Sequence, residues 1–129
     1  KNLASSSTAP LDHDALSVVL VTAGYDHTIR FWEAWSGLCS HTIQYSDSQV
    51  NRLAISPNKR LLAVAGHGVV RLYDCNASGT SISHHDAAGR GINVAPLSTF
   101  EGHTGNVTSI AWHCDGKWLV SGGEDGTLK

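Results

Sequence analysis

The stretch LVTAGYDHTIRFW at residues 20–32 decides how the rest of the chain is interpreted, because it recurs without gaps as LVSGGEDGTLK at residues 119–129. Each copy begins with a short apolar run, passes through a turn rich in Gly and Asp, and enters a second run in which apolar and polar residues alternate. This order is typical of a β-hairpin. A degenerate third copy lies between them, at residues 61–74. The sequence therefore predicts a repeated hairpin, and such a repeat organises a whole fold.

More strands are predicted around these hairpins. Two further strand-like runs are each followed by a turn, and a fourth strand per repeat fits two other segments. The strand-like runs are residues 50–55 and 107–112, the turns are Ser56–Lys59 and His113–Gly116, and the fourth strands are residues 41–44 and 96–100. Arg30 and Arg71 occupy equivalent positions and lie 41 residues apart (71 − 30), within the ~40–45 residues of a four-stranded propeller blade. We therefore expect an all-β fold of antiparallel four-stranded blades.

Two segments do not fit the repeat. The interval from Arg71 to Lys129 is 58 residues (129 − 71), which exceeds one repeat by 17. We assign the excess to an exposed loop insertion at about 75–97, where Gly, Ser, Asn, Ala and His follow no apolar period. Residues 1–17 are polar and Ser-rich, and we expect a disordered tail. The propeller portion is then predicted to span residues 18–129.

Several short motifs make the chain similar to the WD-repeat family. They are Gly102-His103 before a strand, the Asp-x-Thr turns at Asp26 and Asp125, and Trp32 at the end of a strand. The resemblance implies a hydrogen-bonded network within each blade, made by Asp, His, Ser or Thr, and Trp. In the third repeat the matching residues are His103, Ser121 and Asp125, and in the first they are Thr22, Asp26 and Trp32. The middle repeat has Ser46, Ala63, His67 and Tyr73 at these positions and is not expected to form the network.

The resemblance also implies a closed ring of about seven blades, of which roughly two and a half are present. The first repeat has no predicted inner strand, and the Trp of the third would fall two residues beyond Lys129. Fewer than three blades cannot form a ring. We therefore expect the N-terminal part of a longer propeller, incomplete at the C-terminus, with its missing inner strand supplied from downstream. Alone, such a piece is expected to be marginally stable.

Within the WD-repeat family the chain most resembles the small seven-bladed subunits shared by TOR kinase complexes. The resemblance is carried by residues 23–34, 47–53, 70–74 and 100–109, which include Gly-Tyr-Asp-His-Thr and Asp-Ser-Gln-Val-Asn. It implies a non-catalytic scaffold that binds and stabilises the catalytic domain of a TOR-type kinase and joins the other subunits of the complex. It also implies a cytoplasmic location, with peripheral association with endosomal or vacuolar membranes only through the complex.

Propellers bind partners with the loops at their two ends, because the strands serve as rigid supports. The hairpin turns and the entries to inner strands are expected to share one end, with five candidate partner-binding residues: Tyr25, His27, Ser48, Gln49 and His67. Gln49 is the first choice, since a polar residue just before an inner strand lies at the mouth of the central channel. Asp26 is assigned mainly to the blade network.

Other functions have little support in the sequence. A formal net charge of −2 and scattered Lys and Arg residues do not favour nucleic acid. His84, His85 and Asp86 lack the spacing of a structural zinc site, so no metal or cofactor is expected. No nucleophile elbow or phosphate-binding loop indicates an enzyme. Three alternatives stay open: a scaffold of another assembly, a propeller enzyme with its active centre in the missing blades, and a truncated product without function.

Overall fold

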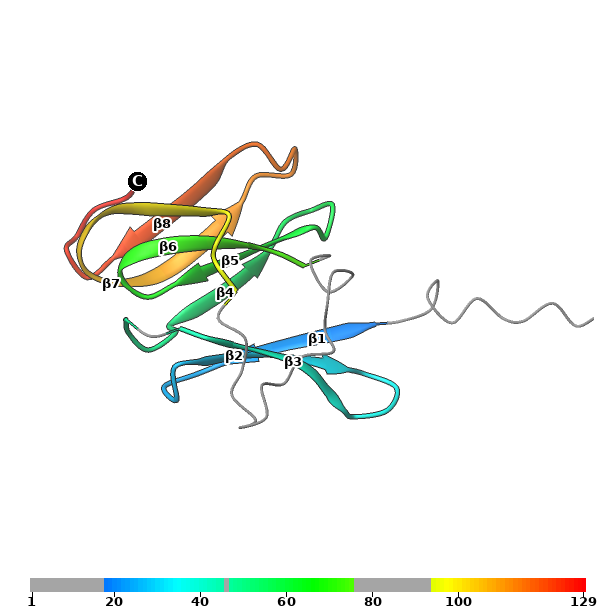
Figure 1. Ribbon diagram of the computed structural model, residues 1–129. Coiled ribbons are helices and arrows are strands. Elements are labelled where there is room, and N and C mark those ends of the chain that lie inside the picture. The colour runs from blue at the N-terminus through cyan, green and yellow to red at the C-terminus, as the bar shows by residue number, and fades with distance from the viewer. Residues whose placement is uncertain (1–17, 46, 76–93) are drawn as a thin grey trace, which may run out of the picture.

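The computed structural model describes residues 18–45, 47–75 and 94–129, all of them in strands, turns and loops (Figure 1). The eight strands are β1 (Val19–Ala23), β2 (Thr28–Glu33), β3 (Cys39–Gln44), β4 (Arg52–Ile55), β5 (Leu61–Ala65), β6 (His67–Asp74), β7 (Ser98–Trp112) and β8 (Leu119–Gly123). One sheet has the order β1-β2-β3 and the other β4-β5-β6-β7-β8, and every pairing is antiparallel. This confirms the expected all-β architecture. The predicted tail, residues 1–17, lies outside the described residues, as do Ser46 and most of the predicted insertion, residues 76–93.

The strands form three successive blades. Blade 1 is β1-β2-β3, and blade 2 is β4, β5, β6 and the first limb of β7, residues 98–101. Blade 3 contains the second limb of β7, residues 107–112, and β8. Lys129 exchanges two backbone hydrogen bonds with Ser121, and Leu128 forms an isolated β-bridge with Gly122. Among the described residues, blade 2 alone has the four strands predicted for each blade.

Strand β7 joins two blades by turning back on itself. Its first limb pairs with β6 and its second limb pairs with β8, and Figure 1 shows the ribbon curving between the limbs. The sequence predicted two separate strands here, at residues 96–100 and 107–112. In the structure Asn106 still pairs with His67, so the connection remains part of the sheet. Gly102 has a φ of 140°, which lies in a backbone region that side chains disfavour and that glycine adopts readily.

The core lies between facing blades. Between blades 1 and 2 the buried side chains are Ile29, Phe31, Ile43, Tyr45, Val50, Leu62, Val64 and Tyr73. A second cluster, between blades 2 and 3, contains Ala63, Ala65, Val70, Val107 and Ile110. Strand β5 contributes to both clusters because it is covered on both faces, which explains why its sequence is continuously apolar instead of alternating. Each large apolar side chain buried here stabilises the fold by roughly 1.5–3 kcal/mol.

Tyr45 is the central side chain between blades 1 and 2. It is fully buried, and the Arg71 guanidinium lies 4.8 Å from the centre of its ring. Arg71 also forms an ion pair with Asp47. Burial raises the pKa of Tyr45 to about 12. These contacts join the end of β3 to β6, in the blade that was predicted to lack the hydrogen-bonded network.

Because the strands are antiparallel, their connections alternate between two ends of the molecule. The first end carries the β1–β2 turn, the segment before β4, the β5–β6 turn, the bend of β7 and the turn after β8. The second end carries the β2–β3, β4–β5 and β7–β8 turns. These two groups of loops are the surfaces on which a partner could be recognised.

Candidate partner-binding site

A network of polar side chains crosses blade 3. His103 lies in the bend of β7, and its Nδ1 is 3.0 Å from Asp125 Oδ2 in the turn after β8. Its Nε2 lies 2.9 Å from Ser121 Oγ on β8. Because a carboxylate can only accept, the Nδ1 atom must carry the hydrogen that joins it to Asp125. The structure thus brings together the three residues assigned to the network in the third repeat.

Asp125 is held by several donors at once. The backbone amides of Thr104 and Thr127 and the Thr127 hydroxyl all donate to its carboxylate, at 2.8–3.1 Å. These hydrogen bonds, the one from the Thr104 amide foremost, hold the pKa of Asp125 well below its usual range. Gly123 is required beside it, since a Cβ atom there would lie 2.7 Å from His103 Nδ1.

Blade 1 forms only part of such a network. The Trp32 indole Nε1 donates to Thr22 Oγ1 at 2.8 Å, joining β2 to β1. Asp26 is not joined to this pair. It accepts from the Thr28 amide and forms an ion pair with Arg30 at 3.2 Å. Hydrogen bonding by Thr28 lowers the pKa of Asp26.

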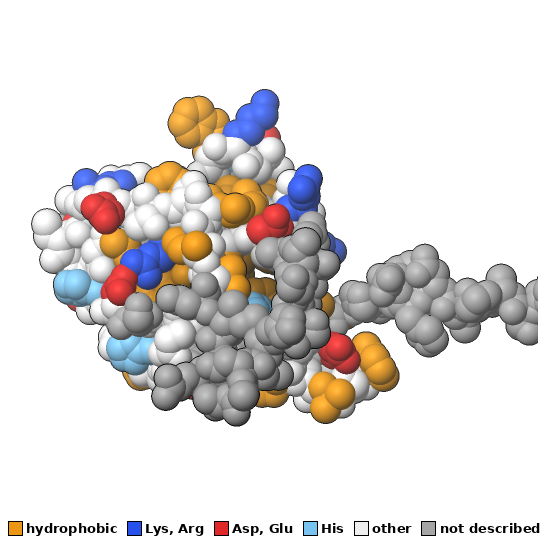
Figure 2. All heavy atoms as spheres, in the orientation of Figure 1, with side chains coloured by type: hydrophobic (Ala, Val, Ile, Leu, Met, Phe, Trp, Pro, Cys, Tyr) orange, Lys and Arg blue, Asp and Glu red, His pale blue; other side chains and the backbone are white. Residues whose placement is uncertain are grey.

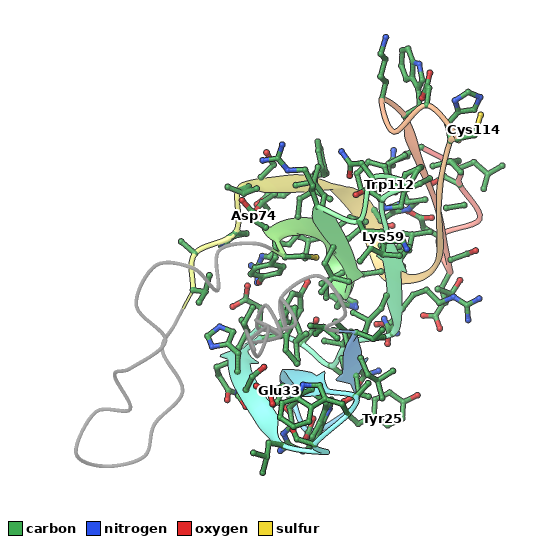
Figure 3. All side chains as sticks on the ribbon, turned by 90° about the vertical axis from the view of Figure 1, so that its right-hand side faces the viewer. Tyr25, Glu33, Lys59, Asp74, Trp112 and Cys114 are labelled. Atoms are coloured by element: carbon green, nitrogen blue, oxygen red, sulfur yellow. The ribbon has the colours of Figure 1, made fainter. Side chains whose placement is uncertain are left out.

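A groove opens at the first end of the molecule, where three blades meet. Its volume is about 330 Å³, and it is lined by Gly24, Tyr25, Gln49, Val50, Asn51, Asn106, Thr108 and Glu124. Tyr25 is 77% exposed and projects from the β1–β2 turn (Figure 3). The amide of Val50 donates to the Gly24 carbonyl, which fixes that turn against the entry to β4. The groove therefore places Tyr25 and Gln49 on one surface, although they come from different blades.

The other three candidate residues lie beside this groove and do not line it. The Ser48 hydroxyl accepts from the His67 amide at 2.9 Å and donates to the Gln49 carbonyl at 3.1 Å, so it holds the loop together. The His67 ring is exposed, with Nδ1 3.3 Å from Asn106 Oδ1. His27 adopts a positive φ of 62° in the turn after Tyr25, and its carbonyl accepts from the Tyr45 amide.

Several groove residues were missed in the sequence. Asn106 forms hydrogen bonds with two of the others. Its Oδ1 accepts from Asn51 Nδ2 at 3.4 Å, and its Nδ2 donates to Glu124 Oε2 at 3.0 Å. A signal for Asn106 was available, because it immediately precedes an inner strand, as Gln49 does. Nothing local in the sequence pointed to Glu124, whose turn reaches the groove only through the pairing of β8 with β7.

Comparison with known proteins now identifies the repeat. The model of the WD domain, G-beta repeat, matches residues 3–33, 37–74 and 94–129. The chain belongs to the WD40-repeat family.

Individual WD40 relatives are also similar over most of the chain. It is 61% identical over 113 residues to the target of rapamycin complex subunit wat1 of Schizosaccharomyces pombe, which covers 88% of this chain and 32% of that protein. It is 55% identical over 114 residues to subunit LST8 of the target of rapamycin complex of Saccharomyces cerevisiae, covering 88% and 33%. The Bos taurus LST8 subunit is 41% identical over 123 residues, covering 95% and 33%. The chain thus spans about a third of the length of these relatives.

The polar network of this WD40 chain has the same pairings as the Ser-His-Asp set of hydrolases. Its geometry is better explained as a tie between strands, because His103, Ser121 and Asp125 come from β7, β8 and the turn that follows. The Ser121 residue is 9% exposed, and its hydroxyl is engaged with His103 Nε2.

A second groove, of about 530 Å³, lies between blades 2 and 3. Apolar side chains form most of it, namely Leu61, Val70, Leu72, Phe100, Trp112, Trp118 and Leu119. Among the described residues no three His, Cys, Asp or Glu side chains are grouped as metal ligands. His84, His85 and Asp86 lie outside those residues. The described part of the chain also has no helix long and apolar enough to cross a bilayer.

Proposed function

We propose that this WD40 chain is part of a non-catalytic scaffold subunit of a TOR complex, and that it binds the catalytic domain of the TOR kinase through its first end. The observation that carries the proposal is its similarity to subunits of target of rapamycin complexes in two yeasts, at 61% and 55% identity. The similarity covers 88% of this chain in both cases, so it includes the loops as well as the strands.

The groove supplies the contact surface in this proposal. Tyr25 offers an exposed aromatic ring, a side chain enriched among the residues that dominate binding energy at interfaces. Gln49, Asn51 and Asn106 line the same groove with amide groups, and the Glu124 carboxylate there accepts from Asn106 Nδ2. Such groups can satisfy the backbone polar groups of a partner segment without burying an unpaired charge. The rigid strands below the loops keep this arrangement in place before binding.

Affinity purification tests the proposal directly. The tagged chain, in the full-length protein that contains it, is recovered from its own cells and the bound proteins are identified by mass spectrometry. Recovery of a TOR-type kinase in stoichiometric amounts is expected. Recovery of a different assembly by a folded bait would show that the protein is a scaffold of that assembly. Recovery of the bait without any bound protein would indicate a non-functional fragment.

A pair of variants then tests the surface. Gln49→Ala is expected to lower kinase recovery several-fold, because it removes a polar side chain that lines the groove. Gln44→Ala is the matched control, since Gln44 is exposed at the end of β3 and does not line the groove. Equal kinase recovery with Gln49→Ala and Gln44→Ala would place the contact elsewhere.

The proposal includes a location. A scaffold of this kind is expected in the cytoplasm, and on endosomal or vacuolar membranes only while it is bound to the complex. Cell fractionation before and after depletion of the kinase distinguishes this from direct membrane binding, which would persist without the kinase.

A further inference from the structure

The second end of the molecule carries a cluster of cationic side chains on two adjoining turns. Lys59 and Arg60 lie in the β4–β5 turn, and Lys117 lies in the β7–β8 turn. The two turns are in contact, because a Cβ atom at Gly116 would lie 3.8 Å from Pro57 Cδ. In Figure 3 this end faces the viewer, with Lys59 and Cys114 labelled on it. We call Lys59, Arg60 and Lys117 the basic cluster.

Both turns are held rigidly by their own hydrogen bonds. In the first, the Ser56 hydroxyl accepts from the Leu61 amide at 2.9 Å and donates to Asn58 Oδ1 at 2.7 Å. Lys59 itself has a φ of 61°. In the second, Asp115 Oδ1 accepts from the Lys117 amide at 2.9 Å. Backbone positions fixed in this way lose little further freedom on binding, which favours recognition of a partner.

Within the described part of the chain, the three cations of the basic cluster have no acidic partner. Their side chains are exposed, and none takes part in an ion pair or a side-chain hydrogen bond. The carboxylate of the same turns, Asp115, is already engaged: it accepts from the Lys117 amide and lies 2.8 Å from His113 Nδ1. The positive charge of this surface therefore remains available to an outside group.

An exposed apolar side chain lies next to the basic cluster in the sequence. Trp118 follows Lys117 directly and is 72% exposed. Trp and Arg are both enriched among the residues that dominate binding energy at interfaces. In Figure 2 orange and blue side chains lie together at the top of the molecule.

We propose that the basic cluster and Trp118 form a second interaction surface, which binds an acidic segment of another protein that also carries an apolar side chain. Carboxylates of that segment would pair with Lys59, Arg60 and Lys117, and its apolar side chain would cover the Trp118 indole. This surface is at the opposite end from the groove, so it does not depend on the proposed contact with the kinase.

An anionic membrane fits the same surface less well. Sequences that bind acidic lipids by charge usually contain four to eight Lys or Arg residues, whereas this surface has three. The chain as a whole has a formal net charge of −2, which gives no general attraction to a membrane or to nucleic acid. A local acidic peptide segment matches a small rigid cluster better than an extended anionic surface does.

Photo-crosslinking in the native assembly tests the proposal. Cys114→p-benzoylphenylalanine places the probe at the exposed tip of the β7–β8 turn, where the thiol has only weak contacts with His113. The expected product joins this position to a segment of a partner protein that has several Asp or Glu residues close to the crosslinked site. The same probe at Gln44 is the positional control and is not expected to reach that segment.

Charge variants decide whether the basic cluster is responsible. Lys59→Glu with Lys117→Glu is expected to lower the crosslink yield at least about fivefold, and Lys59→Arg with Lys117→Arg to preserve it. Arg52→Glu reverses one exposed charge on β4 and is expected to have no effect. Crosslinks only to this chain itself, to lipid or to nothing would overturn the proposal, as would a yield that does not respond to charge reversal. Kinase recovery in the same samples reports separately on the groove.

Discussion

His103 and Asp125 are 22 residues apart in the sequence, yet His103 Nδ1 lies 3.0 Å from Asp125 Oδ2. This hydrogen bond joins the bend of β7 to the turn after β8, and Ser121 extends it onto β8 itself. The network adds side-chain contacts to the backbone pairing of β7 with β8 in blade 3. Glu124, the neighbour of Asp125 in the turn after β8, lines the groove, which links the stability of the blade to its proposed function.

Removing the histidine is expected to destabilise the protein. His103→Ala removes the partner of the buried Ser121 hydroxyl and one of the donors to Asp125, and an unpaired buried polar group costs about 1–3 kcal/mol. Denaturant unfolding of the purified protein measures the change. His113→Ala is the control, because that ring is 57% exposed and pairs only within its own turn. Equal free energies of unfolding for the two variants would show that the network does not stabilise blade 3.

Stability is expected to fall in acid because of Asp125. Its pKa is lowered in the folded state, chiefly by the Thr104 amide, so its contribution is complete above the unfolded value. The contribution is lost as the pH falls from about 5 towards the lower folded pKa. Thermal unfolding measured across this range should show a decreasing midpoint, and Asp125→Asn should make the decrease shallower. An unchanged slope in Asp125→Asn would assign the effect to other carboxylates.

Tyr45 predicts a loss of stability in strong base. Burial raises its pKa from 10.0 to about 12, so the folded state favours the neutral phenol. This contribution is complete below pH 10 and disappears as the pH rises from 10 towards 12. Tyr45→Phe keeps the ring beside Arg71 and should lose less stability over that range. Denaturant unfolding at several alkaline pH values measures it, and identical profiles for the two proteins would refute the assignment.

Packing between blades 1 and 2 is expected to depend on Gly66. A Cβ atom at this position would lie 2.5 Å from Ser48 Oγ and 2.7 Å from the Tyr45 hydroxyl oxygen. Gly66→Ala should therefore destabilise the protein by about 1–3 kcal/mol, the usual cost of overpacking. Gly24→Ala is the control, since nothing lies within 4 Å of its added carbon. Thermal unfolding compares them, and a Gly66→Ala midpoint equal to that of Gly24→Ala would contradict the contact.

The sequence determined the strands, the turns and the repeat, because these depend on neighbouring residues. Alternating apolar residues fix which face of β2 is buried, and the turn at Ser56–Lys59 is closed by hydrogen bonds among residues within five positions of one another. A polar residue before an inner strand, such as Gln49, could also be chosen from its position alone.

Only the tertiary structure decided which of these residues meet. The groove combines Tyr25, Gln49, Asn106 and Glu124 from three blades, and its shape depends on how the blades pack. The same is true of Arg71 on the Tyr45 ring and of Ser48, whose hydroxyl accepts from the His67 amide. Such contacts arise between residues tens of positions apart, where no local pattern specifies a distance, so they became visible only when the strands were placed side by side.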